Sequence, residues 1–505
     1  MKRGVLLVRA DATVTSGTGH VMRCLALAQA WQHASGDVIF AMAQSTPAIG
    51  ERLRSEQVKI VAIEAVDGSA EDLRQTIDAA VFHDAEWLVV DGYHFKAHYV
   101  SELQNVRPLL VLDDNGELES YSSELVLNQN VHARAEMYAK RAPRTRLLLG
   151  PRYTLLRNEF TAYRDWARKV PARGTRVLVT MGGSDPKDLT PRILAALAGL
   201  PIDDLQIRVV VGGSAENRSG VTEAAERFPG RVEVMSSVAN MAEVMAWADL
   251  AIAGAGTTCW EMCLLGVPAI LVVVAANQRF IAEHLATIGA AVNAGLAEWL
   301  DGSSLAQITA ELLEDGDRRG KMSQSARQLV DGLGSERVRA ALLDRELGLR
   351  LVRESDRRLL FEWADDPVAR AASFRSAAIS WEDHARWFAE RLQDPRSVIY
   401  IGENTAHERV GLVRFQIQGE SAVLSVNVAP EFRGQGWGRE LIVFSVNSLV
   451  RERSVRRVDA FVKPDNRASV RLFEASGFRR AGTERVADQD ALLFTWESGN
   501  ETHVH

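Results

Sequence analysis

Short apolar runs alternate with amphipathic segments over the first 300 residues of the chain. Uninterrupted apolar runs are typical of strands buried on both faces, whereas segments 22–34 and 71–83 carry their apolar side chains at helical spacing. This alternation predicts the α/β fold class, with two doubly wound parallel sheets that have helices on both faces. The expected strands are GVLLVRA, DVIFAMA, VKIVAI, EWLVVDGY and RPLLVLDD in the first sheet, and TRVLVTMGG, LQIRVVVGG, RVEVMSS, ADLAIAGAG and VPAILVVV in the second.

A different pattern begins at residue 349, where strands and helices no longer alternate one by one. SVIYIGE, RVGLVRFQI and AVLSVNVAP predict consecutive strands, and EFRGQGWGRELIVFSVNSLV predicts a loop followed by a helix. This order of elements predicts a separate C-terminal α+β domain. The expected domains are residues 1–165, residues 170–325, a helical linker over residues 326–348, and residues 349–498.

The composition suits a globular protein of several domains, with 505 residues of which 47% are hydrophobic and 25% charged. A net charge of −7 disfavours nucleic acid as a partner, because proteins that bind nucleic acid usually carry a basic surface. The three cysteines, Cys24, Cys259 and Cys263, are too few for a disulfide framework. We therefore expect a cytoplasmic protein, with small core cysteines rather than metal ligands. The N-terminus does not resemble a signal peptide, and VPAILVVVAA is too short to span a membrane, so no stable membrane association is expected.

The segment SGTGHVMRCLALAQAW places a histidine at the start of a predicted helix. Gly17 and Gly19 permit a tight turn after the first strand, and N–H groups at a helix start attract anions. A histidine at this position is held toward its neutral form and can act as a general base. His20 could therefore be a general base, although for a lone histidine helix capping or packing is the favoured interpretation.

The segment RADATVTSGTGHVMRCLALA resembles the N-terminus of the UDP-sugar hydrolases of pseudaminic acid biosynthesis. That family carries its catalytic histidine in a G-x-G-H-x-x-R loop, which Gly17, Gly19, His20 and Arg23 match. The resemblance covers roughly residues 1–325 and implies a GT-B-like pair of Rossmann-type domains, similar to the glycosyltransferase that builds peptidoglycan lipid II. It also implies that His20 activates a water molecule, which attacks C1 of the sugar with inversion and releases UDP.

The second predicted sheet offers glycine turns for the diphosphate of UDP. AGAGTTCWEM places N–H groups at a helix start, and Glu261, one turn into that helix, suits the ribose hydroxyls. The resemblance adds an Asn-Gln pair after VPAILVVV, which without it would be assigned to a helix cap. The expected UDP-sugar contacts are Gly17, Gly19, Arg23, Tyr93, Gly182, Gly183, Gly254, Gly256, Thr257, Thr258, Glu261, Asn277 and Gln278, with Ser184 beside the MGG turn.

Carboxylates follow two strands of the first predicted sheet. Asp91 precedes Tyr93 in LVVDGYHF, and we expect Asp91 to orient a neighbour and Tyr93 to contact the sugar. Asp113 and Asp114 are consecutive, so their side chains point in opposite directions along an extended chain. We assign this pair to a loop and expect no metal.

The C-terminal domain contains EFRGQGWGREL, which resembles the R/Q-x-x-G-x-G/A loop of the GNAT acetyltransferases. Successive N–H groups of such a loop face the pyrophosphate of coenzyme A at a helix start. VKPDNRASVRLFEASGF resembles the second signature of that family, and the resemblance implies acetyl-CoA as a co-substrate. The expected cofactor contacts are Val428, Arg433, Gly434, Gln435, Gly436, Trp437, Gly438, Asn466 and Phe473.

Phe473 stands where many GNAT enzymes have a tyrosine that protonates the departing thiolate. Phenylalanine cannot donate this proton, so the sequence assigns no general acid. The front of the domain resembles the acetyltransferase of the same pathway. Trp363, His384 and Trp387 could line the acceptor site or pack in the core, and the two tryptophans suit either place equally.

The two resemblances together predict a bifunctional enzyme. In that pathway, acetyl transfer to the 4-amine of a UDP-linked amino sugar directly precedes hydrolysis of the product at C1. The alternative is a GT-B glycosyltransferase with a GNAT domain that acts on a protein amine or on a different amino sugar. A sensor of nucleotide sugars is a third reading, which turnover would exclude.

Overall fold

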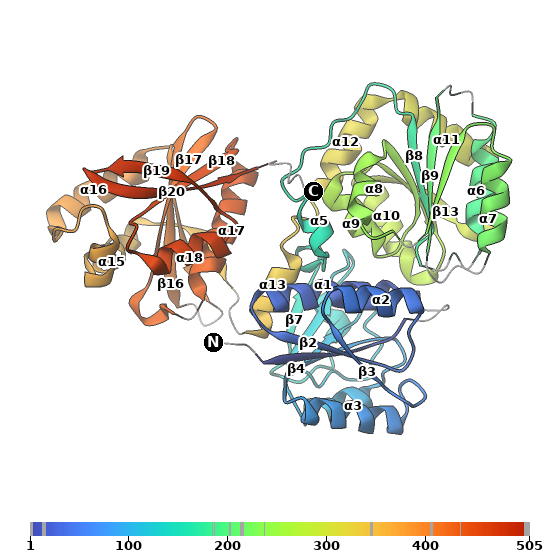
Figure 1. The fold of residues 1–505 in the computed structure, drawn as a ribbon, viewed down its shortest axis with the longest axis horizontal. Helices are drawn as coiled ribbons and strands as arrows, with labels where there is room; N and C mark the ends of the chain where they lie inside the picture. Colours follow the sequence, from blue (N-terminus) through green and yellow to red (C-terminus); the bar gives the residue numbers. More distant parts are fainter. Residues whose placement is uncertain are drawn as a thin grey trace. The chain divides into compact units, whose positions relative to one another are not determined.

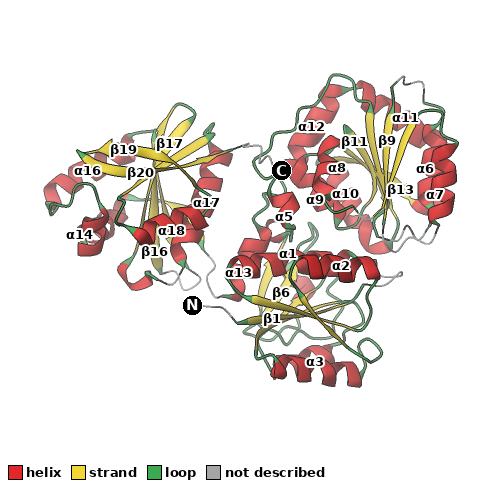
Figure 2. Ribbon diagram, in the orientation of Figure 1, coloured by secondary structure: helices red, strands yellow, loops and turns green. Residues whose placement is uncertain are grey.

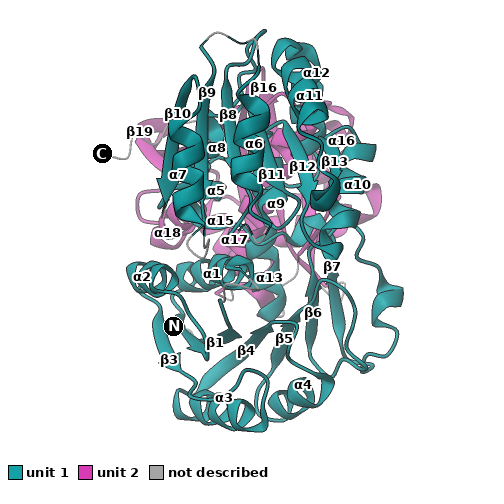
Figure 3. Ribbon diagram, turned by 90° about the vertical axis from the view of Figure 1, so that its right-hand side faces the viewer, with its two compact units in different colours: residues 1–342 teal, residues 343–505 magenta. Residues whose placement is uncertain are grey.

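The computed structural model describes residues 4–12, 17–183, 185, 187–200, 202, 204–212, 217–236, 238–343, 347–404, 408–434 and 436–498. The chain divides into two compact units, residues 1–342 and 343–505, which Figure 3 draws in different colours. The expected Gln435 and Ser184 contacts lie outside the described residues. Each unit is described by itself.

The N-terminal half of the first unit consists of β1 (Val5–Ala10), α1 (Gly19–His33), β2 (Asp37–Met42), α2 (Pro47–Ser55), β3 (Lys59–Ala62), α3 (Ala70–Phe82), β4 (Ala85–Asp91), α4 (Ala97–Gln104), β5 (Leu109–Leu112), β6 (Leu125–Asn128), η1 (Ala135–Tyr138) and β7 (Arg146–Leu149). The strands form one parallel sheet in the order β3-β2-β1-β4-β5-β6-β7. Helices α1 and α2 cover one face of this sheet, and α3 and α4 cover the other (Figures 1 and 3). Because both faces are covered, the inner strands are almost wholly apolar.

The C-terminal half of the first unit consists of β8 (Arg176–Thr180), α6 (Leu189–Leu197), β9 (Gln206–Val211), α7 (Arg218–Glu226), β10 (Arg231–Ser236), α8 (Met241–Trp247), β11 (Leu250–Gly254), α9 (Thr258–Leu265), β12 (Ala269–Val273), η3 (Ala276–Gln278), α10 (Arg279–Thr287), β13 (Ala291–Leu296), η4 (Ala297–Trp299), α11 (Gly302–Glu314), α12 (Gly316–Arg327) and α13 (Gly334–Leu342). The strands are again all parallel, in the order β10-β9-β8-β11-β12-β13. Both sheets have a topological switch point, where the strand order reverses. It lies between β1 and β4 in the first sheet and between β8 and β11 in the second. Ligands of such sheets bind outside the carboxyl ends of the strands at this point.

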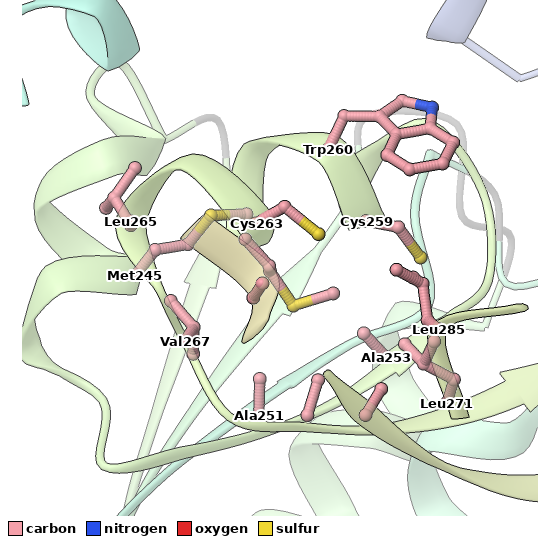
Figure 4. Close-up of a cluster of buried hydrophobic side chains, with 14 of the residues drawn as sticks. Met245, Ala251, Ala253, Cys259, Trp260, Cys263, Leu265, Val267, Leu271 and Leu285 are labelled. Atoms are coloured by element: carbon pink, nitrogen blue, oxygen red, sulfur yellow. The ribbon is translucent and has the colours of Figure 1, made fainter. Parts of the chain in front are cut away.

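One core of the second sheet lies beneath α8, α9 and α10, and Figure 4 shows part of it. Cys259 and Cys263, one turn apart on α9, belong to this cluster, Cys263 on the side of Met245 and Cys259 near Leu285. Burial raises the pKa of both thiols, to about 12 for Cys263. Both cysteines therefore act as small apolar residues, as the sequence favours.

The connection between the two sheets contains η2 (Pro151–Tyr153) and α5 (Asn158–Thr161). Arg168 anchors its end by donating to the carbonyl oxygens of Met245, Ala248 and Leu265 at 2.5–3.0 Å. These carbonyls close α8 and α9, whose last oxygens have no partner within the helix. The helix α13 returns to pack against α1 and η2, so residues 326–342, which the sequence analysis includes in a linker, belong to the first unit.

The second unit consists of β14 (Gly348–Leu351), η5 (Glu354–Asp356), α14 (Arg357–Asp365), α15 (Pro367–Ala372), α16 (Trp381–Gln393), β15 (Ser397–Glu403), β16 (Arg409–Gln418), β17 (Ser421–Val428), η6 (Pro430–Phe432), α17 (Trp437–Glu452), β18 (Arg457–Val462), α18 (Arg467–Ala475), β19 (Arg479–Val486) and β20 (Gln489–Glu497). Its sheet is mixed, in the order β14-β15-β16-β17-β18-β20-β19, and only β17 and β18 run parallel to each other. The main core packs α17 and α18 on one face, and a smaller cluster packs α14 and α16 on the other (Figure 2). The fold class predicted from the sequence is confirmed for both units.

Candidate active sites

His20 lies in the first turn of α1, directly after the glycine turn that follows β1. Gly17 has φ +71°, a conformation that favours glycine, and the helix begins at Gly19. The His20 side chain is 9% exposed, and its Nδ1 lies 2.6 Å from Oδ1 of Asp91, the last residue of β4. A carboxylate only accepts hydrogen bonds, so Nδ1 carries the proton and Nε2 keeps its lone pair.

Arg23 holds Asp91 from the next turn of α1. Its Nε and Nη2 donate to the two Asp91 oxygens at 2.6 and 2.7 Å, and its Nη1 donates to Asp114 at 2.8 Å. The guanidinium is 5% exposed and every one of its nitrogens is engaged by a carboxylate. Arg23, expected among the UDP-sugar contacts, therefore positions the partner of His20 instead.

Asp91 is ionised in this setting. Burial alone would raise the pKa of its carboxyl, but the charges of Arg23 and His20 outweigh burial and hold that pKa well below its usual range. The same balance of burial against Arg23 lowers the pKa of Asp114. The site thus combines one histidine with two carboxylates and one arginine that hold one another in place.

Tyr93 joins the two halves of the first unit at this site. Its ring meets His20 edge to face at 4.8 Å, and its hydroxyl donates to Asp114 Oδ2 at 2.8 Å. Asn277, from η3 of the second sheet, donates to the same hydroxyl at 3.2 Å. Tyr93 is 46% exposed, so part of its ring can meet a ligand.

Three glycine turns converge on the start of α1. A Cβ atom placed on Gly183 would lie 3.0 Å from the backbone nitrogen of Thr18, and one on Gly19 would lie 3.4 Å from Thr257 Oγ1. Glycine therefore allows the turn after β8 to approach the turn after β1. Gly182 completes the turn after β8 with φ +82°.

The turn between β11 and α9 holds the residues for which the sequence analysis predicts diphosphate contacts. Gly254 ends β11, Gly256 lies in the turn, and Thr257 and Thr258 begin α9. Four N–H groups at a helix start have no partner within the helix, and they favour a negative charge. Gln278 approaches the same turn, because a Cβ on Gly256 would lie 3.6 Å from Nε2 of Gln278.

Glu261, the expected ribose contact, has a partner already. Its carboxylate lies 3.1 Å from Nη2 of Arg157, which comes from the connection between the two sheets, and its side chain is 14% exposed. Arg157 also donates to Glu159 at 2.7 Å. Burial raises the pKa of the Glu261 carboxyl, and Arg157 opposes the rise.

A cavity of about 420 Å³ lies behind Tyr93, between α4 and the chain that follows β5. Phe95 and Leu118 give it apolar walls, and Lys96 and Glu117 bring charges of both signs to its lining. The cavity meets the histidine site through Tyr93, which belongs to both.

Asp11, Asp67 and His94 bring their ligand atoms within 4.8 Å of one another. Asp11 is already matched in charge, because Arg9 lies 2.7 Å from it and the N–H groups of Ala43 and Gln44 donate to it. Within the described chain, the cation that faces this group of possible ligands is thus Arg9. The contacts of His20 described above do not involve this group.

The second unit places the expected cofactor loop at the end of β17. Arg433 donates through Nε to the carbonyl of Val428, and its Nη2 lies 2.7 Å from Asp366. Gly434 and Gly436 have φ +73° and +94°, and α17 begins immediately afterwards. These glycines allow consecutive N–H groups to turn toward one anion.

The edge of β17 is open beside this loop. The register pairs Ser421–Leu424 with Arg457–Ala460 of β18 and ends there, whereas β17 continues to Val428. The last four residues of β17 therefore keep backbone groups on that side for an extended ligand.

Four other expected cofactor residues pack in the core of the second unit or stabilise its helices. Trp437 and Phe473 are each 4% exposed in the main core, where Phe473 packs on Phe478 and Phe494. Asn466 caps α18 by accepting the N–H of Ser469 at 3.0 Å. Gly438 lets α18 approach, because a Cβ there would lie 3.1 Å from the Leu472 methyl groups.

His384 is a core residue on the acceptor side of the second unit. It is 3% exposed between the rings of Phe361, Trp381, Trp387 and Phe388, and within the described residues neither ring nitrogen has a hydrogen-bond partner. Trp363 is 4% exposed, and its carbonyl accepts a hydrogen bond from Asn427 of β17.

Comparison with known proteins agrees with this division of the chain. The model of the glycosyltransferase family 28 C-terminal domain matches residues 176–336, and that of the acetyltransferase (GNAT) domain matches residues 346–479. The spore coat polysaccharide biosynthesis protein SpsG of Bacillus subtilis is 31% identical over 238 residues, which are 47% of this chain and 69% of SpsG. The chain belongs to the SpsG family.

Two other similarities extend further along the chain but are weaker. An uncharacterised protein of Methanocaldococcus jannaschii is 22% identical over 484 residues, covering 93% of this chain and 96% of its own length. The crystal structure of MurG from Acinetobacter baumannii covers 67% of this chain and 99% of its own chain at 17% identity, with a TM-score of 0.47. The family matches thus give an SpsG-like part with a glycosyltransferase family 28 C-terminal domain, followed by a GNAT domain. No helix in the described part of the chain is long and apolar enough to cross a membrane.

Two residues have contacts that the sequence analysis does not predict. It assigns Asp114 to a loop, yet Asp114 binds Arg23 and Tyr93 at the histidine site, and it does not single out Arg157, which pairs with Glu261. The sequence does contain a signal for Asp114, because Asp114 lies just after β5, the neighbour of β4, and Asp91 is the last residue of β4. No local sequence pattern predicts the contact of Arg157, because its partner Glu261 is distant in the sequence.

Proposed function

We propose that this member of the SpsG family is a bifunctional enzyme of sugar-nucleotide metabolism. The second unit acetylates the 4-amine of UDP-4-amino-4,6-dideoxy-N-acetyl-β-L-altrosamine with acetyl-CoA. The first unit then hydrolyses the product to UDP and 2,4-diacetamido-2,4,6-trideoxy-L-altrose, as in pseudaminic acid biosynthesis. The observation that carries this proposal is the contact of 2.6 Å between His20 Nδ1 and Asp91.

The His20–Asp91 pair suits activation of water. Asp91 fixes the ring orientation and leaves Nε2 as the proton acceptor, and its charge stabilises the imidazolium that forms. Water attacks C1, the bond from C1 to the β-phosphate oxygen breaks, and UDP leaves with the bonding electron pair. N–H groups at the start of α9 receive the charge that develops on the diphosphate.

Acetyl transfer would use the open edge of β17. The pantetheine chain lies along the unpaired backbone of residues 425–428, and the pyrophosphate lies on the turn containing Gly434 and Gly436. The amine attacks the thioester carbonyl and the C–S bond breaks. Phe473 is buried and has no proton to give, so CoA leaves as a thiolate or takes its proton from solvent.

The test is a mass-spectrometric time course with the full chain and the UDP-linked 4-amino sugar. UDP and the free diacetamido sugar should appear only when acetyl-CoA is present. His20→Ala should abolish UDP release and leave acetyl transfer intact, because the base belongs to the first unit alone. Acetylation without UDP release by the wild type would contradict the hydrolase half of the proposal.

Glycosyl transfer is the second candidate for the first unit. The cavity of about 420 Å³ beside Tyr93 favours it, since an acceptor seated there would adjoin the histidine site. The same time course separates the two functions, because a transferase releases UDP only when an acceptor sugar is added.

A further inference from the structure

Arg414 lies on the face of the second unit's sheet that α14 and α16 cover. Its neighbours along β16, Val413 and Phe415, pack into the main core on the opposite face. The strand register places Arg414 between Ile399 of β15 and Ser425 of β17. An arginine therefore occupies a position of the kind that apolar side chains fill in the adjoining cluster.

The guanidinium of Arg414 has no counter-charge among the described residues. It stacks over the ring of Trp387 at 5.3 Å, and neither a hydrogen bond nor an ion pair reaches it from the described residues. The nearby Arg391 is occupied, donating to Gln416 at 2.7 Å and lying 3.5 Å from Asp394. Burial and the charge of Arg391 lower the pKa of Arg414. A partly buried cation without a partner is costly, so a ligand that brings an anion would be favoured there.

The position of Arg414 fits an acceptor rather than acetyl-CoA. Ser425, its partner in the register, begins the stretch of β17 with the open edge. Arg414 therefore lies one strand, about 5 Å, away from that edge, on the side opposite β18. In a sugar that reacts at a 4-amine, C1 and its phosphate lie across the pyranose ring from the reacting nitrogen. A nucleotide sugar can thus place its amine at the edge and its diphosphate at Arg414.

We infer that Arg414, stacked on Trp387, is the subsite of the acetyltransferase unit for the diphosphate of a nucleotide-linked amino sugar. This inference rests on the proposed function and adds a residue that selects the acceptor. A guanidinium recognises phosphate oxygens through paired hydrogen bonds, and the tryptophan ring holds it in one plane. A polycationic acceptor would be repelled by the same group.

The test compares Arg414→Met with the wild-type full chain in acetyl transfer. Methionine keeps a long side chain on Trp387 and removes the charge. The KM for the UDP-linked 4-amino sugar should rise about 10- to 100-fold, the loss expected for a charge-assisted hydrogen bond. The KM for acetyl-CoA, and that for the same amino sugar without UDP, should stay within about twofold of the wild-type values.

Arg386→Met is the matched control. Arg386 also lies on the α14/α16 side of the unit, but its side chain is 71% exposed and is held by Asp383, so its loss should change no kinetic constant. An unchanged KM for the UDP-linked sugar in Arg414→Met overturns the inference and leaves the proposed function intact. A raised KM for acetyl-CoA also overturns it, because it assigns Arg414 to the cofactor. No acetylation of the UDP-linked sugar by the wild type overturns the proposed function together with the inference.

Thermal unfolding distinguishes a binding role from a structural one. Removing an unpaired, partly buried charge should leave the ligand-free chain as stable as the wild type or more stable. A lower unfolding temperature for Arg414→Met, with an unchanged KM for the UDP-linked sugar, would mean that Arg414 serves packing alone.

Discussion

Asp91 Oδ1 lies 2.6 Å from Nδ1 of His20, and Arg23 binds both oxygens of the same carboxylate. The three residues come from the ends of β4 and the start of α1, which the sheet topology brings together. Asp91, and with it the His20 ring, therefore has a fixed orientation before any substrate binds. The general base proposed for His20 requires such preorganisation.

Asp91→Asn should reduce the turnover of UDP-sugar hydrolysis on the order of 10²–10⁴-fold with little change in KM. An asparagine can present its NH₂ group to Nδ1 and thereby favour the wrong tautomer of His20. Steady-state kinetics of UDP release measure both kinetic constants. Asp78→Asn, on the exposed face of α3, is the control, and equal losses in the two variants would contradict the role of Asp91.

Glu261→Gln should raise the KM for the UDP-sugar about tenfold and leave kcat nearly unchanged. The carboxylate can accept two ribose hydroxyls, whereas the amide accepts on one side only. Steady-state hydrolysis of the UDP-sugar measures this. Glu283→Gln on α10 removes a carboxylate that only pairs with the exposed Arg279 and should change nothing. A lower unfolding temperature of Glu261→Gln with an unchanged KM would mean that Glu261 has only a structural role, as the ion-pair partner of Arg157.

The sequence predicts most strands of the two parallel sheets. The predicted runs coincide closely with β1–β5 and β8–β12, whereas β6 and β7, with four residues each, and β13 are not among the predicted strands. A four-residue run such as LVLN does not distinguish a strand from a turn of buried helix.

The sequence could predict those parts of the candidate site whose residues lie together because of the strand order alone. Because parallel strands end at one edge, Asp91 and Tyr93 after β4 had to lie near the glycine turn after β1. The sequence could not show that Arg23 is enclosed by two carboxylates. That arrangement depends on side-chain directions after β4 and β5, which no local pattern specifies.

Gly436→Ala should raise the KM for acetyl-CoA about tenfold without affecting UDP release. Gly436 has φ +94° at the start of α17, and an alanine there would cost about 1–2 kcal/mol or rotate the N–H groups of the loop. Gly419→Ala is a matched control, because Gly419 has φ +63° in the turn between β16 and β17 with open space around its Cα. Acetyl-CoA saturation curves measure the KM of both variants. If the two substitutions raise the KM equally, backbone strain and not the loop explains the effect.

His384 should make the second unit less stable in mild acid. Burial, and then the charge of Arg357, lower the pKa of His384 below its ordinary value near 6.5. The unfolded chain therefore binds a proton at a pH where the folded chain does not. Stability is complete above about pH 6.5 and falls as the pH drops below that value, by at most about 1.4 kcal/mol per pH unit for one proton.

His384→Leu should remove this dependence, since leucine fills a similar space between Trp387 and Phe388 and takes no proton. Thermal unfolding of the full chain at pH 7.5 and 5.5, followed by tryptophan fluorescence, measures the effect. The wild type should lose more stability between these two values than the variant does. Equal losses would mean that His384 is protonated in the folded chain. Its ring nitrogens would then need an acceptor, although the described residues offer none.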